Sequence, residues 1–237
     1  MKKGLLYLIP TTLGPGPAEA VIPAGILDIS RRLIHFIAEN ERTARRYLKS
    51  AGTLIPLDEL QFGLLNKHTR PEEIPALCKP LLNGTNMGLI SEAGLPGIAD
   101  PGAAAVAWCH QNGVHVVPCS GPSSIVLALV ASGFNGQEFI FRGYLPIERR
   151  ERQQLLKIME REAAGGGPSQ IFMETPFRNE KLLEQILENC SSATELCIAC
   201  DITLESAFIK TATVAYWKKQ KPNLRKRPCI FIIGVSQ

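Results

Sequence analysis

The sequence of 237 residues lacks the signatures of several large protein classes. No apolar run approaches the ~20 residues that a membrane-spanning helix needs. The four histidines show no metal-ligand spacing, and the seven cysteines are an odd number without the regular spacing of a disulfide framework. The dinucleotide-binding glycine fingerprint, the Walker A loop, the nucleophile-elbow serine and the metalloprotease motifs are also absent. We therefore expect a reduced, cytoplasmic protein with no metal and no membrane partner.

What the sequence does contain is the composition of a globular protein with an uneven charge. Hydrophobic residues make up 45% and charged residues 20% of the chain, and the net charge is +4. Basic residues gather in four places, at residues 31–32, 42–49, 149–152 and 218–227. Any one cluster is explained as well or better by a solvated surface. Together the four clusters favour a polyanionic partner such as RNA, because phosphate neutralisation supplies most nucleic-acid affinity.

The first half of the chain alternates apolar runs with helical patterns. The expected strands cover residues 5–10, 33–38, 87–91 and 114–119, and the expected helices cover residues 41–50, 71–82 and 103–112. Strands without polar alternation, separated by helices, predict a parallel sheet that is buried on both faces. This half is expected to be an α/β domain of residues 1–119.

The second half repeats the pattern less regularly. Helices are expected at residues 123–131, 149–162 and 178–189, and strands at residues 138–141, 170–174, 195–201, 207–214 and 229–235. Strands that follow one another at the end of the chain predict antiparallel pairs in a mixed sheet. We expect a second α/β domain of residues 120–237, with helices flanking its sheet.

The loop SEAGLPGIADPG, residues 91–102, is the most informative segment. It follows an apolar run and precedes a stretch of small residues, so it joins a strand to a helix. Its glycines permit a close approach of backbone to a ligand, and its prolines stiffen it. Asp100 precedes Pro101, where it can cap the next helix. Ligands bind at such strand ends in open α/β sheets, although an ordinary connection explains this loop alone equally well.

A second loop, residues 120–124 (SGPSS), also leads from a strand into a helix. Its hydroxyls and the free amides of the helix form a concavity rich in donors, which suits a carboxylate or a ribose. A simple helix cap is the competing interpretation. With the loop at residues 91–102, it could form the opposite wall of one cleft.

These motifs and four others, in this order, carry a resemblance to a known family. The others are LYLIPT (residues 6–11), AENER (38–42), FRGYLP (141–146) and FMETPFR (172–178). Over nearly its whole length the chain resembles the tetrapyrrole methylase superfamily, and within it the branch that methylates ribose 2′-hydroxyls of small-subunit ribosomal RNA. The resemblance implies two α/β domains, S-adenosylmethionine bound in the cleft between them, and a homodimer.

By position, the resemblance implies a cofactor site formed by several loops. The implied cofactor-binding residues are Pro10, Thr11, Glu92, Ala93, Gly94, Pro96, Ile98, Ala99, Asp100, Ser123, Ser124, Met173 and Thr203. A hydroxyl acceptor needs a base to remove its proton. Three residues are candidates for this catalytic role: Glu174, which ends a buried strand and is preferred, Glu39 and His68. Arg42 and Arg178 are expected to bind phosphate or carboxylate groups of the substrate.

The motifs depart from the family pattern mainly where the substrate is expected. Asn40 stands for an acidic residue in the Glu-Asp-Thr-Arg motif, and the His-Glu-His-Asn motif reads Asn66-Lys67-His68-Thr69. A lysine of the Glu-Leu-Thr-Lys segment is replaced by Leu204. Two alternatives to ribosomal RNA methylation therefore remain open: methylation of a small acceptor such as a tetrapyrrole, and a cofactor- or RNA-binding module that has lost catalysis.

Overall fold

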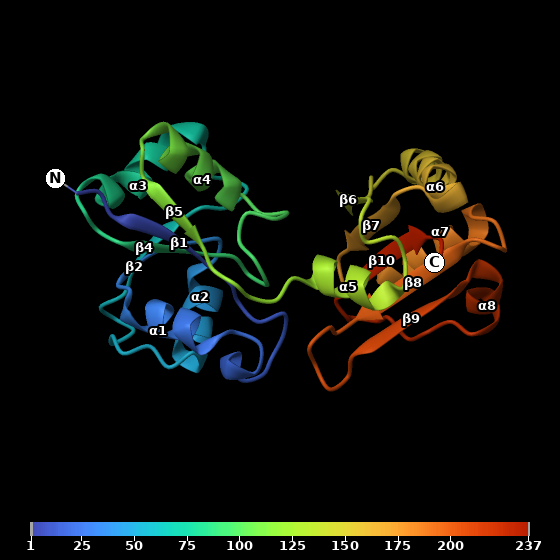
Figure 1. Ribbon diagram of the computed structural model, residues 1–237, viewed down its shortest axis with the longest axis horizontal. Helices are drawn as coiled ribbons and strands as arrows, with labels where there is room; N and C mark the ends of the chain where they lie inside the picture. Colours follow the sequence, from blue (N-terminus) through green and yellow to red (C-terminus); the bar gives the residue numbers. More distant parts are fainter. Residues whose placement is uncertain (1, 237) are drawn as a thin grey trace. The chain divides into compact units, whose positions relative to one another are not determined.

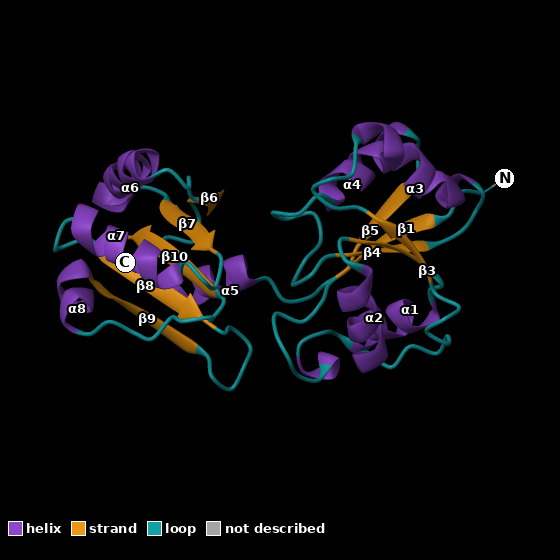
Figure 2. Cartoon of the chain, turned by 180° about the vertical axis from the view of Figure 1, so that it is seen from behind, coloured by secondary structure: helices purple, strands orange, loops and turns teal. Residues whose placement is uncertain are grey.

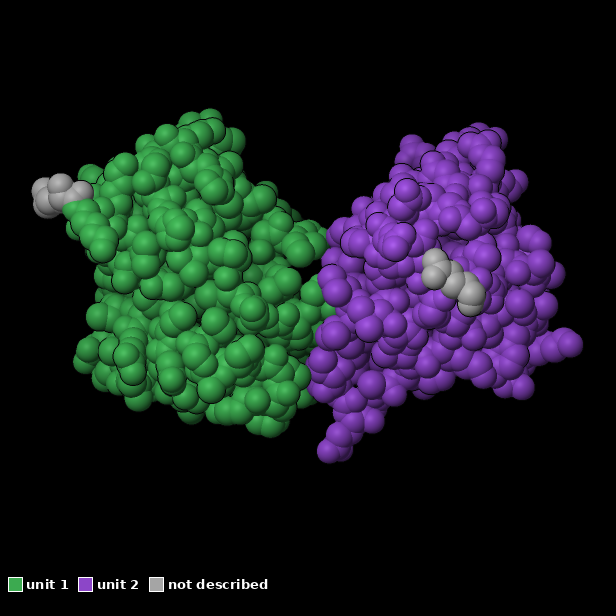
Figure 3. Space-filling view, in the orientation of Figure 1, with its two compact units in different colours: residues 1–123 green, residues 124–237 purple. Residues whose placement is uncertain are grey.

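The computed structural model describes residues 2–236. The chain divides into two compact units, which are coloured separately in Figure 3: unit 1 is Met1–Ser123 and unit 2 is Ser124–Gln237. Each unit contains one five-stranded sheet. No helix of the described residues is both long enough and apolar enough to cross a bilayer.

Unit 1 contains a parallel sheet in the strand order β3-β2-β4-β1-β5. Its strands are β1 Leu5–Ile9, β2 His35–Ala38, β3 Gln61–Leu64, β4 Met87–Ile90 and β5 His115–Pro118. Neighbouring residues of a strand enter different cores: Leu89 packs in one cluster and Ile90 in the other. This alternation is the reason why the strands read as continuous apolar runs.

Helices cover both faces of this sheet (Figure 1). Helices α1 (Ala24–Arg32) and α2 (Glu41–Ser50) lie on one face, and α3 (Ile74–Leu82) and α4 (Gly102–Gln111) lie on the other. The 3-10 turns η1 (Ala18–Ala20) and η2 (Pro71–Glu73) precede α1 and α3. Asn40 begins α2, because its side-chain oxygen accepts hydrogen bonds from the backbone N–H groups of Arg42 and Thr43.

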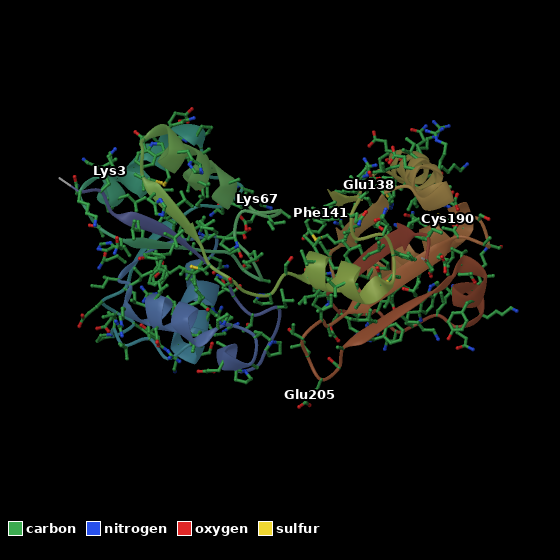
Figure 4. The ribbon with its side chains drawn as sticks, viewed as in Figure 1. Lys3, Lys67, Glu138, Phe141, Cys190 and Glu205 are labelled. Carbon is green, nitrogen blue, oxygen red and sulfur yellow. The ribbon has the colours of Figure 1, made fainter. Side chains whose placement is uncertain are left out.

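Unit 2 contains a mixed sheet in the order β6-β7-β10-β8-β9. Its strands are β6 Phe139–Tyr144, β7 Ser169–Glu174, β8 Glu195–Cys200, β9 Phe208–Thr213 and β10 Cys229–Gly234. Only β6 and β7 run parallel, and the other neighbours are antiparallel. The loop between β8 and β9 carries Glu205 at its tip (Figure 4).

The core of unit 2 lies between the sheet and three helices (Figure 2). These are α6 (Arg149–Ala163), α7 (Asn179–Asn189) and α8 (Val214–Lys219), whose buried Leu156, Ile186 and Trp217 pack in one cluster with Phe172 and Phe231 of the sheet. The short turn η3 (Ala164–Gly166) follows α6. Helix α5 (Ser124–Ser132) packs instead on β9 and β10.

The fold prediction is confirmed as two flanked α/β sheets, one parallel and one mixed. Three elements were missed: α1, the edge strand β3, and α8. β3 is four residues long and half exposed, so it lacks the buried apolar run of its neighbours. Residues 214–219 were divided between a strand and a loop, because a helix of six residues gives almost no periodic signal.

Candidate functional site

Adjacent strands of unit 1 send their following segments to opposite faces of the sheet. β1 leads towards α1 on one face, while its neighbour β4 leads to α4 on the other. The carboxyl ends of two such strands form a topological switch point, which is where open α/β sheets bind ligands. The predicted loop at residues 91–102 lies at this point.

Three loops of unit 1 meet at the switch point. The backbone N–H of Thr11 donates a hydrogen bond of 2.9 Å to the carbonyl of Gly94, which ties the β1 loop to the β4 loop. A Cβ on Gly94 would lie 3.2 Å from the carbonyl oxygen of Pro122, and one on Gly121 would lie 2.3 Å from Cβ of Pro10. The loop after β5 therefore approaches both of the others, and glycine is needed for that approach.

Asp100 shapes the β4 loop from inside. Both of its carboxylate oxygens lie 2.9 Å from the backbone nitrogen of Gly97, and Oδ1 also accepts a 2.7 Å bond from Gly102, the first residue of α4. Between these donors Ala99 is held at φ 60°, a conformation that costs about 1–2 kcal/mol in a residue with a side chain. Asp100 thus organises the loop, which is a different task from the predicted direct contact with the cofactor.

A group of three carboxylates lies at this edge. Glu39 follows β2, and burial together with the nearby charges of Glu92 and Asp100 raises the pKa of its carboxyl above the usual value. The pKa of Asp100 is also raised, chiefly by burial, although its backbone hydrogen bonds act in the opposite direction. The structure therefore brings together three carboxylates predicted from two motifs, Glu39 from one and Glu92 and Asp100 from the other. Among residues 2–236 no group of His, Cys, Asp and Glu could hold a metal ion.

The remaining cofactor residues predicted in unit 1 lie on the same loops. Pro10, Gly94, Pro96 and Ser123 are buried, whereas Glu92, Ala93, Ile98 and Ala99 are exposed. Thr11 is 3% exposed, and its Oγ1 has no hydrogen-bond partner among residues 2–236. A buried hydroxyl without a partner costs about 1–3 kcal/mol, so Thr11 offers an unsatisfied polar atom to a ligand at the switch point.

His68 lies in the loop after β3, and Arg42 lies in α2, the helix that follows β2. Both residues are exposed. The backbone N–H of His68 donates to Asn66, within the loop that carries Lys67 (Figure 4). Beside this loop lies an open groove of about 340 Å³, lined mainly by apolar side chains of the β3–α3 segment and α4, together with Asn66, Thr69 and Gln111.

In unit 2, Glu174 lies in a buried cluster with two arginines. Its side chain is 1% exposed; Oε1 accepts bonds of 2.6 Å from Arg178 and 2.7 Å from the backbone of Thr175, and Oε2 lies 3.8 Å from Nη1 of Arg152. Both oxygens of this carboxylate thus face guanidinium groups. Glu174 therefore holds Arg178, and its assignment as the base stays a prediction.

The other residues predicted in unit 2 lie on separate segments. Met173 precedes Glu174 on β7, and Ser124 begins α5. Thr203 lies between β8 and β9 with φ 77°. Asp201, two residues before Thr203, is held by a 2.7 Å ion pair with Arg227 and by the Ser206 hydroxyl.

Arg152 is the participant that sequence reasoning missed. Helix α6 was predicted at residues 149–162, and its buried residues include Arg152, Leu156 and Met159. This spacing of i, i+4 and i+7 places the arginine on the apolar face. A single charged residue on the apolar face of a helix indicates that Arg152 needs a buried partner.

Curated relatives are methyltransferases. The chain is 28% identical to ribosomal RNA small subunit methyltransferase I of Vibrio cholerae, over 97% of this chain and 76% of that protein, and 28% identical to the protein of the same name from Escherichia coli O157:H7, over 98% and 78%. The protein of that name from Halalkalibacterium halodurans is 29% identical, over 98% and 76%. No family model matches the chain.

Solved structures share the fold. The methyltransferase CobJ matches with a TM-score of 0.62 at 14% identity, over 98% of this chain and 94% of that one. The cobalt precorrin-4 methyltransferase CbiF matches with a TM-score of 0.59 at 13% identity, over 97% and 94%.

The relatives define the class of this protein: it is a methyltransferase. The predicted resemblance to small-subunit ribosomal RNA methyltransferases is confirmed by the curated relatives, and the predicted fold is shared with CobJ and CbiF.

Proposed function

We propose that this enzyme transfers a methyl group from S-adenosylmethionine to a ribose 2′-hydroxyl of small-subunit ribosomal RNA. The observation that carries the cofactor site is the switch point between β1 and β4, where three loops meet around the unpartnered hydroxyl of Thr11. The name of the curated relatives supports ribosomal RNA as the acceptor.

The chain's own residues fit the cofactor. The hydroxyl of Thr11 can bond to a polar cofactor group, and the backbone of residues 94–99 offers close approach. Glu39 and Glu92 supply negative charge for a cationic ligand. The bound cofactor supplies an electrophilic methyl group on a sulfonium, whose positive charge disappears on transfer. In unit 2, Ser124, Met173 and Thr203 are the residues proposed to contact the cofactor.

We propose Glu39 as the base that accepts the ribose proton. Its pKa is raised above the ordinary carboxyl value, which brings it closer to the operating pH at which a base is most effective. His68 is the second candidate, because its loop borders the groove. Arg42 and Arg178 are proposed to bind phosphates of the RNA.

Two measurements test the proposal in sequence. Calorimetric titration with S-adenosylmethionine should give heat that S-adenosylhomocysteine competes away. Incubation of the protein with labelled S-adenosylmethionine and unmodified small ribosomal subunits should place the label on one ribose of the RNA. Absence of heat would contradict the cofactor site, and a label on protein, on a base or nowhere would contradict the acceptor.

A small-molecule acceptor is the second candidate function. The observation that favours it is the groove of about 340 Å³ beside α4, whose walls are mainly apolar. Adding a uroporphyrin-type tetrapyrrole to the same labelling assay tests it directly. Cofactor binding without transfer to RNA or tetrapyrrole would instead indicate a module that has lost catalysis.

We also propose that the protein acts in the cytoplasm as a homodimer, as the resemblance implies. Light scattering coupled to gel filtration tests the dimer. A mass near the 25.9 kDa of one chain would contradict it.

A further inference from the structure

Phe177 occupies an unusual place for an aromatic side chain. It is 81% exposed in the turn after β7, the strand that ends at the buried Glu174. The backbone N–H of Arg178 donates to the carbonyl of Thr175 and closes this turn, and Pro176 sits at the position where a fixed φ suits it. The ring is therefore presented to solvent by a stiff segment.

A second apolar side chain shares this edge of the sheet. β6 and β7 are parallel neighbours, so the segments that follow them begin at the same edge. The segment after β6 carries Ile147, which is 74% exposed. A single exposed apolar residue is ordinary, but here two extend from adjacent strand ends.

Cationic groups lie beside the aromatic turn. Arg178 follows Phe177 directly, and Glu174 anchors its guanidinium at 2.6 Å while 40% of the side chain stays exposed. The backbone N–H of Lys226 donates to the carbonyl of Pro176 at 3.2 Å, which places the basic segment of residues 225–227 against the turn. Arg225 and Lys226 are exposed and take part in none of the ion pairs formed within residues 2–236.

We propose that this edge of unit 2 binds single-stranded RNA, with an unpaired base stacked on Phe177 and the neighbouring phosphates held by Arg178, Lys226 and Arg225. The inference rests on the proposed function, because it assigns a docking place for the RNA acceptor. Aromatic rings beside cations are the combination with which proteins bind unpaired nucleotides. A protein partner would use the apolar area of Phe177 and Ile147 and would not need a row of cations.

The test measures binding of a fluorescent single-stranded RNA of about 12 nucleotides by anisotropy, at several salt concentrations. Phe177→Ala should weaken binding roughly 5- to 150-fold, the range measured when a stacking aromatic is removed. The slope of log affinity against log salt should stay unchanged in this variant. Phe177→Tyr should restore binding, whereas Phe177→Leu, which keeps apolar bulk without a π face, should resemble Phe177→Ala.

Lys226→Gln should behave differently from the Phe177 variants. Removing one phosphate contact lowers the salt slope by about 0.7 for a single strand. Val130→Ala is the matched control, because Val130 is 77% exposed on α5 of the same unit, and it should leave affinity and slope unchanged. A duplex of the same sequence should show no dependence on Phe177, because its bases are already stacked.

Three results would overturn the inference: wild-type affinity in Phe177→Ala, wild-type affinity in Phe177→Leu, which would indicate an apolar protein-docking surface, or an equal loss for duplex RNA. Cofactor titration of the same variants should match the wild type and serves as the check on folding. Phe177-dependent RNA binding without methyl transfer would overturn the proposed function alone. Methyl transfer without Phe177 dependence would overturn this inference alone.

Discussion

The loop edge of the unit 1 sheet and the β6–β7 edge of unit 2 use opposite chemistry. In unit 1, glycines, backbone groups and three carboxylates surround the switch point, and Glu39 has a raised pKa because of burial and its acidic neighbours. In unit 2, a single buried carboxylate, Glu174, faces Arg152 and Arg178, with an exposed aromatic ring next to them. The first edge suits a cationic cofactor and the second a polyanion. One chain therefore presents two edges of opposite charge.

The largest expected effect is a loss of stability when the buried carboxylate of unit 2 is removed. Glu174→Ala removes the carboxylate that neutralises Arg152, whose side chain is 6% exposed, and should lower the free energy of unfolding by about 3–5 kcal/mol. Urea unfolding measures this loss. The control is Glu188→Ala, which removes an exposed partner of Arg149 and should cost less than about 1 kcal/mol. Equal losses in the two variants would show that the buried cluster is no more important than a surface pair.

A smaller effect is expected at the unit 1 edge. Gly94→Ala forces a side chain into φ 74°, which costs about 1–2 kcal/mol, and brings a Cβ to 3.1 Å from the Leu13 side chain. It should weaken S-adenosylmethionine binding in calorimetry about tenfold, because the loop that approaches the cofactor must move. Gly165→Ala is the matched control: it has φ 68° with nothing near its Cβ, so it should lower stability without changing the cofactor affinity. Unchanged cofactor binding in Gly94→Ala would show that the β4 loop is not the binding loop.

The smallest effect is a dependence of stability on pH. Because the folded-state pKa of Glu39 lies above its ordinary value of 4.5, the folded protein binds more protons than the unfolded chain in that interval. The free energy of unfolding should fall as the pH rises from the ordinary carboxyl range through the raised pKa, and Glu39→Gln should flatten this decline. Urea midpoints measured over that pH range test it.

Glu73 should contribute a pH dependence of stability with the opposite sign, which Glu73→Gln should remove. Its partner Arg70 lowers the pKa of the Glu73 carboxyl, so this pair contributes stability at neutral pH that is lost as the pH falls through the lowered pKa. If stability depended on pH in the same way in Glu39→Gln and in the wild type, Glu39 would not have the pKa raised by burial, Glu92 and Asp100.

Regular, buried elements could be predicted from the sequence because their pattern reports burial directly. Helix α2 was predicted with its observed bounds, since Asn40 marks its start and its apolar positions have helical spacing. β3 could not be predicted in this way, because an edge strand with Gln61 and Leu64 exposed has no distinctive pattern. Tertiary pairing with β2 decides its conformation.

The residues of the candidate site could be predicted from the sequence, but the contacts between them could not. Loop motifs indicated Thr11, Gly94 and Asp100, but only the fold reveals that Asp100 bonds to its own loop and that Thr11 has an unpartnered hydroxyl. Glu174 was correctly predicted at the end of a buried strand. Its two arginine partners come from segments 22 and 4 residues away, Arg152 and Arg178, and a strand pattern carries no information about either.

The cap of α2 has a consequence for how such an enzyme can diversify. Asn40 holds the helix start through one side-chain oxygen, an atom that aspartate and asparagine both possess. Exchanging one for the other therefore alters the charge next to Glu39 while leaving the scaffold at nearly constant stability. The charge at this edge of the sheet can therefore change without compensating mutations in the core.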